Sequence, residues 1–193
     1  MDRLEFLVEE ESMAEILKVL LPQILSDSWK LNENYFIRPH QGKQDLKRSI
    51  ANKLIGFARM KHIRTGFFIM QDQDSNDCRV LKQDIINICK QHSANNIGYL
   101  VRIVCHELEA WYLGDMFAIQ SVFPRFNSQR YANSARFRVP DNCVNPCDEL
   151  KKIVGDYSQI GMAKKIAPCM SITRNISKSF QQFVSGVTKL ANM

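Results

Sequence analysis

The sequence has no hydrophobic run long enough to span a bilayer. Its first residues, MDRLEFLVEEESMAEIL, also lack the apolar segment and the small-residue cleavage site of a signal peptide. The 8 glycines form no glycine-rich phosphate loop, and the 4 histidines fall into no Ser-His-Asp pattern. These absences argue against membrane insertion, P-loop nucleotide binding and triad hydrolysis, and we expect a soluble protein of the cytoplasm.

Disulfide-framework spacing is missing too, although the sequence contains 6 cysteines, which in a cytosolic chain are normally reduced. Cys143 and Cys147 would suit half of a zinc site, but no second pair of Cys or His residues stands nearby. The sequence therefore favours two ordinary thiols in a loop or in a first helical turn.

The chain is long enough for one sizeable core with a small appended lobe, because it has 193 residues and 45% hydrophobic content. Strands are expected at residues 4–8, 35–38, 66–70 and 97–105. Between them we expect helices after residue 12, from about 45 to 60 and from about 78 to 92. This alternation predicts an α/β fold with a mostly parallel sheet and helices on both faces.

The last third of the sequence has a different character. Residues 124–147 are polar, broken by prolines and rich in Asn and Arg, which predicts a long loop or a small insertion. Helices are expected at about 148–155, 161–169 and 177–191. We therefore expect an α/β core at residues 1–123, and at 124–193 a loop insertion with a C-terminal helical extension packed on that core.

Positive and negative charge are segregated along the chain, whose net charge is +6. Residues 40–64 and 151–193 each carry a local charge of +6, whereas residues 1–39 carry −4 and residues 65–150 carry −2. This separation suits a protein that acts on an anionic polymer such as nucleic acid. Lysines and arginines of the basic blocks would bind the polymer, and carboxylates of the acidic stretches would hold a metal ion beside it. Solvated helix faces are an equally ordinary explanation for any single basic residue.

Carboxylates follow three of the predicted strands: Glu9 follows the first, Asp72 and Asp74 a central one, and Glu107 and Glu109 another. In a doubly wound sheet the residues after the carboxyl ends of the strands meet in one crevice. Carboxylates that lie so close repel one another unless a cation neutralises them, and hard oxygen ligands favour Mg²⁺ or Mn²⁺. An alternative explanation for these carboxylates stays open: they could cap helices or lie in solvated turns without binding a metal.

Some candidates are favoured over their neighbours. Glu109 is preferred to Glu107 for the site, because the two positions on a helix point in different directions. Trp111 and Tyr112 are expected in the core, and Ser177 is expected to cap a helix. Phosphate contacts by basic side chains, as opposed to plain solvation, are considered for Lys43, Lys47, Arg48, Lys164 and Lys165.

Two short motifs carry a resemblance to a known family. Val8 and Glu9 after one strand, and Asp72, Gln73 and Asp74 after another, resemble the two signatures of Toprim domains. These domains occur in topoisomerases, bacterial primases and overcoming-lysogenization-defect nucleases. Over most of its length the chain is similar to a Toprim-like domain-of-unknown-function family, with matching segments at residues 42–46 (GKQDL), 72–82, 107–115 (ELEAWYLGD) and 177–180 (SKSF).

The resemblance implies a Toprim fold with Mg²⁺ at Glu9, Asp72 and Asp74. Relatives are often encoded beside an ATPase and have suspected roles in defence against phage, so the resemblance also implies an ATPase partner. Glu10 departs from the pattern, since Toprim domains usually carry a glycine at this position. A side chain there could crowd the approach of a phosphate to the backbone.

The sequence as a whole predicts a nuclease that uses Mg²⁺, or Mn²⁺, for phosphodiester chemistry on DNA or RNA. Asp72, Asp74 and Glu109 are the predicted metal ligands, and Glu9 is the predicted general acid or base. The Glu10 departure motivates an alternative, a non-catalytic Toprim-shaped partner or scaffold for an ATPase or nucleic acid. A phosphatase or phosphotransferase with Asp72 as nucleophile is a third reading.

Overall fold

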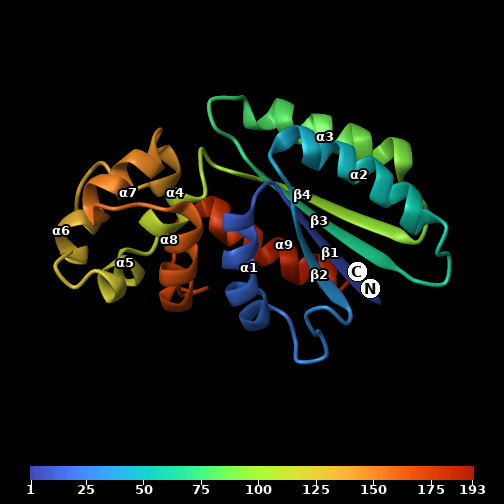
Figure 1. Cartoon of the computed structure of the whole chain (residues 1–193), viewed down its shortest axis with the longest axis horizontal. Helices are drawn as coiled ribbons and strands as arrows, with labels where there is room; N and C mark the ends of the chain where they lie inside the picture. Colours follow the sequence, from blue (N-terminus) through green and yellow to red (C-terminus); the bar gives the residue numbers. More distant parts are fainter.

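Four parallel strands form the central sheet of the computed structural model, which describes residues 1–193 (Figure 1). The strands are β1 (Arg3–Val8), β2 (Tyr35–Pro39), β3 (Thr65–Asp72) and β4 (Ile97–Val104), in the order β2-β1-β3-β4. Parallel neighbours need crossover connections, which here are the helices α1 (Glu11–Ile24), α2 (Lys43–Ala58) and α3 (Cys78–His92). The predicted α/β architecture is confirmed.

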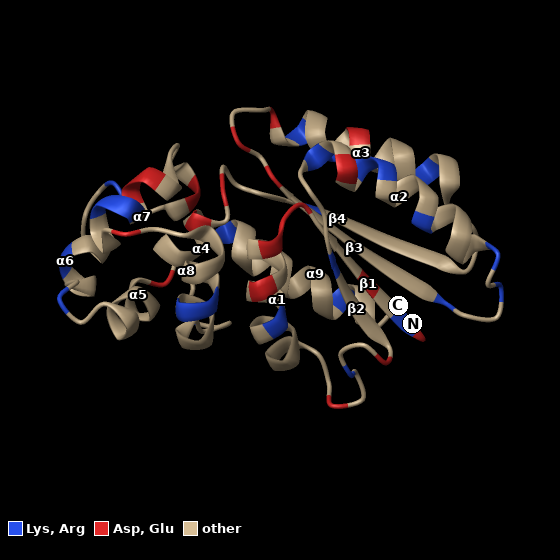
Figure 2. Ribbon diagram, in the orientation of Figure 1, with Lys and Arg blue, Asp and Glu red and all other residues tan.

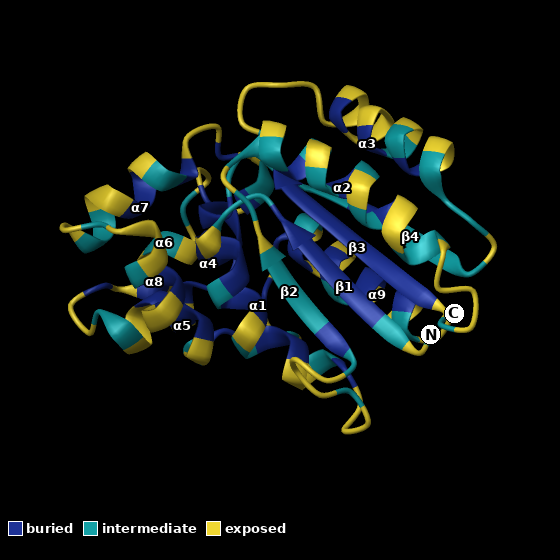
Figure 3. Cartoon of the chain, turned by 45° about the vertical axis from the view of Figure 1, so that its right-hand side comes forward, coloured by how far each residue is buried: buried dark blue, intermediate teal, exposed yellow.

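Both faces of the sheet are covered by helices (Figure 1). Phe68 and Met70 of β3 pack in the cluster that includes α1 and α9 (Lys178–Ala191), whereas Phe67 and Ile69 pack in the cluster that includes α2 and α3. All of β3 is buried, as Figure 3 shows. A strand that is buried on both faces reads as a continuous apolar run, and this explains the unalternating segment GFFIM.

A helical lobe lies beside the sheet (Figure 1). It consists of α4 (Glu109–Leu113), α5 (Met116–Val122), α6 (Ser128–Ala132), α7 (Pro146–Val154) and α8 (Gln159–Ile166), with 3₁₀ turns at Pro140–Asn142 and Ala167–Cys169. Its buried side chains belong to the same hydrophobic cluster as those of β1, α1 and α9, so the lobe shares one core with that face of the sheet. None of the helices is both long enough and apolar enough to cross a membrane.

The segment 124–147 is more ordered than its composition predicts. It contains α6 and a 3₁₀ turn, where a loop or a small insertion was expected. The Asn127 side chain caps α6 by accepting the N–H of Arg130, and the rings of Phe126 and Phe137 pack on Tyr131. Helices α7, α8 and α9 confirm the three that were predicted after it, and the division of the chain at residue 123 stays a prediction.

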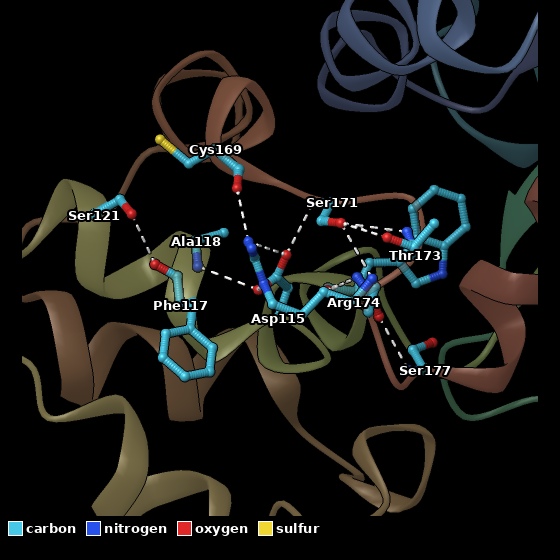
Figure 4. A network of polar contacts seen from close by, with 11 residues as sticks. Asp115, Phe117, Ala118, Ser121, Cys169, Ser171, Thr173, Arg174 and Ser177 are labelled. Atoms are coloured by element: carbon cyan, nitrogen blue, oxygen red, sulfur yellow. Dashed lines mark hydrogen bonds and ion pairs between the residues drawn. The ribbon is translucent and has the colours of Figure 1, made fainter.

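Asp115 joins the lobe to the segment that leads into α9 (Figure 4). Its side chain is fully buried, and it accepts hydrogen bonds from the N–H of Ala118 at the start of α5 and the N–H of Ser171. The guanidinium of Arg174 donates to both carboxylate oxygens, with Nε at 2.7 Å and Nη2 at 2.9 Å. One carboxylate thus caps a helix and ties two separate stretches of chain together.

Asp115→Ala will lower the free energy of unfolding by about 2 kcal/mol, because it removes the α5 cap and the charged hydrogen bonds of a buried acceptor. The 44% exposure of the Arg174 side chain limits the loss, since the freed guanidinium can be hydrated. Urea denaturation will measure the change. Asp148→Ala is the matched control, because the Asp148 side chain is 62% exposed. Equal losses in the two variants would contradict the structural role of Asp115.

Candidate metal centre

The carboxyl ends of β1 and β3 mark the topological switch point of the sheet. From β1 the chain crosses to β2 on one side, and from β2 it returns past β1 to β3 on the other side. Loops diverge at such a point and leave a crevice, where α/β proteins gather functional groups. Glu9 directly follows β1 and Asp72 ends β3, and the N–H of Asp72 donates to Oε2 of Glu9 at 3.0 Å.

Asp72 is buried, with 8% of its surface exposed, and its Oδ1 has no hydrogen-bond partner. Burial, together with the nearby carboxylates of Glu109 and Glu9, raises the pKa of Asp72 well above its usual range. A buried acceptor without a partner is costly, and a charged one more so. A cation at this place would satisfy Oδ1 and favour the ionised carboxylate, so Asp72 is a candidate ligand.

Glu109 is the first residue of α4, is 2% exposed and lies close enough to Asp72 to affect its pKa. We call Glu9, Asp72, Glu109 and the carboxylates beside them the acidic cluster. The hydroxyl of Tyr157 donates to Oε1 of Glu109. Burial, together with the charges of Glu107 and Glu10, raises the pKa of Glu109 to about 7. Ligand atoms of Glu107, Glu109 and Cys147 all lie within 4.8 Å of one another, and the N–H of Cys147 donates to Oε2 of Glu107 at 2.9 Å.

Asp74 lies at the exposed rim of the cluster, in the loop between β3 and α3. Its backbone is left-handed (φ 52°), and its N–H donates to the carbonyl oxygen of His106 at 2.7 Å, which joins this loop to the one after β4. Oδ2 of Asp74 pairs with Nζ of Lys43, at the start of α2, at 2.5 Å. Beside these loops lies an acidic cavity of about 510 Å³, lined by Gln73, Asp74, Ser75, His106, Glu107, Val144 and Asn145.

Glu10, at which the sequence departs from the Toprim pattern, is accommodated without backbone strain. Its φ of −148° and ψ of 170° are extended values that any residue adopts. Ser12 donates its hydroxyl to the Glu10 carboxylate. The charge of Glu10 contributes to the raised pKa values of Asp72, Glu109 and Glu9, so this residue adds a carboxylate to the cluster.

The chemistry of the donors fits a hard divalent cation. Burial also raises the pKa of Glu9, to about 6, so three carboxylates of the cluster have raised pKa values. A cation would offset both the burial and the mutual repulsion, and Asp72 and Glu109 are the residues best placed to hold it. Cys147 suits a hard cation less, because thiolate sulfur is a soft ligand and Mg²⁺ and Mn²⁺ prefer oxygen.

The basic residues predicted to contact phosphate are not all at this place. Lys43 is, through its ion pair with Asp74, whereas Lys47 pairs with Asp84 on α3 at 3.5 Å. Lys164 lies 3.9 Å from Glu15 of α1. Arg48 and Lys165 are exposed and make no ion pair.

Sequence reasoning missed several neighbours of the cluster. Tyr112 is buried in the core, as predicted, but its hydroxyl has no partner, and charges of Glu109, Glu10 and Asp72 contribute to its raised pKa. Tyr157 and Cys147 come from the lobe, about 40 residues or more after Glu107. Only Glu10 carried a readable signal, since it stands beside Glu9 in the polar turn Glu9 to Ser12.

Comparison with solved structures finds the C-terminal region of the OLD protein of Xanthomonas campestris pv. campestris. The TM-score is 0.51 at 15% sequence identity, and the similarity covers 100% of this chain and 97% of that one. A likeness at this identity supports a shared fold. No curated protein matches the sequence. A family model matches residues 8–188, and the chain therefore belongs to the family described as "Domain of unknown function (DUF4276)".

Proposed function

We propose that this protein hydrolyses phosphodiester bonds of nucleic acid with a divalent cation, Mg²⁺ or Mn²⁺, held by Asp72, Asp74 and Glu109. The observation that carries the proposal is the buried carboxylate of Asp72, whose Oδ1 has no partner at the switch point of a parallel sheet. The fold shared with the C-terminal region of an OLD protein supports it, because the resemblance of the motifs is to Toprim nucleases.

A divalent cation at these carboxylates would supply charge stabilisation to the oxygens of a reacting phosphodiester. The chain's own residues bind and orient the substrate around it. Lys43 adds positive charge at the rim, where a phosphate oxygen can displace the Asp74 carboxylate from its ammonium group. The Asp72 N–H fixes Oε2 of Glu9 and leaves Oε1 without a protein partner, which suits Glu9 to the transfer of a proton.

A nuclease fits the cluster better than an aspartyl-phosphate enzyme does. A nucleophilic Asp72 must be ionised and open to an incoming phosphate, whereas it is 8% exposed and surrounded by other carboxylates that oppose its ionisation. A cation shared among several carboxylates satisfies the same arrangement. The nucleic acid class is DNA or RNA.

The test is incubation of the purified protein with linear double-stranded DNA, single-stranded DNA and RNA, in EDTA, in Mg²⁺ and in Mn²⁺. We expect cleavage of at least one polymer, only when the divalent cation is present. Calorimetric titration with Mn²⁺ at pH 8 measures cation binding independently. Absence of both cleavage and cation binding in the folded protein would contradict the proposal.

A further inference from the structure

A second cavity, of about 340 Å³, lies beside the acidic cavity at the carboxyl edge of the sheet. Four cationic side chains from three elements line it: Arg79 and Lys82 of α3, Arg102 of β4 and Lys178 of α9. Figure 2 shows the starts of α3 and α9, both with basic residues, facing this edge. We call this cavity the basic pocket. The acidic cavity is close by, since Cys105 lines the basic pocket and the next residue, His106, lines the acidic cavity.

None of these four cations forms an ion pair with a carboxylate of the protein. Two acids near the starts of α3 and α9 are engaged with backbone N–H groups. Asp77 accepts the N–H groups of Arg79 and Val80 at the start of α3, and Asp141 accepts the N–H of Lys178 at the start of α9. Helix N-termini offset the charge of these two acids, so the positive side chains have no anion of their own.

Arg102 is the most confined of the four. Its guanidinium packs against Gly186 of α9, where a Cβ atom would lie 3.1 Å from Nη2. Nε donates to the carbonyl oxygen of Gln182 at 3.0 Å and Nη1 to that of Val101 at 3.2 Å, while Nη2 makes no hydrogen bond. A half-buried guanidinium that is held in place without a counter-ion is arranged to receive an anion.

We propose that the basic pocket binds a phosphodiester group of the nucleic-acid strand whose neighbouring linkage lies at the acidic cluster. The inference rests on the proposed function and adds a second contact point, which sets the path of the strand across the carboxyl edge of β3 and β4. The free Nη2 of Arg102 offers a directed hydrogen bond to a phosphate oxygen. Arg79, Lys82 and Lys178 add the charge that displaces counterions from the strand.

The test compares two variants of equal charge in binding a short fluorescent oligonucleotide in EDTA. The pocket variant carries Arg79→Gln, Lys82→Gln and Lys178→Gln, all at exposed positions, and leaves the packed Arg102 intact. The control variant carries Lys30→Gln, Lys90→Gln and Lys189→Gln, which are also exposed but lie towards the amino edge of the sheet. We expect the pocket variant to bind about tenfold more weakly, with a salt slope shallower by about 0.7 to 1. The control should bind within about threefold of the wild type.

Several outcomes would overturn the pocket. Equal losses in the two variants would assign the effect to net charge alone, and unchanged binding by the pocket variant would remove the contact. Binding of inorganic phosphate that the pocket variant loses, with oligonucleotide affinity unchanged, would make the pocket a site for free phosphate. Cleavage is assayed in parallel. If the wild type cleaves no polymer but the pocket variant alone binds the oligonucleotide more weakly, the pocket is kept and the nuclease is rejected. If the pocket variant cleaves with the KM of the wild type, the nuclease is kept and the pocket is rejected.

Discussion

Asp72→Asn will lower metal-dependent cleavage by about 1000-fold. The substitution keeps the shape of the side chain and removes the charge that would hold the cation, while the N–H of Asp72 can still donate to Glu9. Loss of metal-derived charge stabilisation is worth several kcal/mol, and about 1.4 kcal/mol corresponds to each factor of ten in rate. Single-turnover cleavage of the best substrate from the screen measures the effect.

The same variant separates a ligand from a structural aspartate. Because Asp72 is buried among other carboxylates, the neutral asparagine removes repulsion, and the metal-free variant should unfold at a temperature equal to or higher than that of the wild type at pH 8. Asp84→Asn is the matched control, since Asp84 is half-exposed on α3 and pairs with Lys47. Wild-type activity in Asp72→Asn, or its collapse into an unfolded protein, would reject Asp72 as the metal ligand.

Much of the fold could be predicted from local pattern. The buried strand β3 is a continuous apolar run, and helix α3 begins at Cys78 because the Asp77 side chain accepts the next N–H groups. The order of the strands could not be read, because it depends on which faces pack together and not on any local residue. Helix α6 was missed because its five residues have weak periodicity and are held by ring packing across the lobe.

The candidate site divides in the same way. Glu9 and Glu109 come after strands and Asp72 ends one, and the rule that strand ends converge places them together. Cys147 and Tyr157 reach Glu107 and Glu109 only because the lobe folds back over α4, which no spacing in the sequence reveals. Lys43 and Lys47 are one helical turn apart on α2, yet only Lys43 pairs with Asp74. Helix α3 packs beside α2, and Lys47 pairs with Asp84 of that helix instead.

Glu109→Gln will make the metal-free protein more stable than the wild type at pH 8 and leave it almost unchanged at pH 4.5. In the wild type the pKa of Glu109 rises from 4.5 to about 7 on folding, because burial and neighbouring carboxylates disfavour its charge. The folded state thus binds more protons than the unfolded state, and stability falls as pH rises from about 4.5 to about 7. The rise in pKa corresponds to roughly 3 kcal/mol.

Urea denaturation in EDTA at several pH values will measure this difference. Glutamine keeps an oxygen that can accept the Tyr157 hydroxyl, so the change isolates the charge. Glu33→Gln is the control, because Glu33 is exposed and makes no ion pair, and it should show no such pH dependence. Mn²⁺ at pH 8 should then stabilise the wild type more than Glu109→Gln, since a bound cation relieves a repulsion that the variant lacks. Equal stabilisation of both proteins would place the cation away from Glu109.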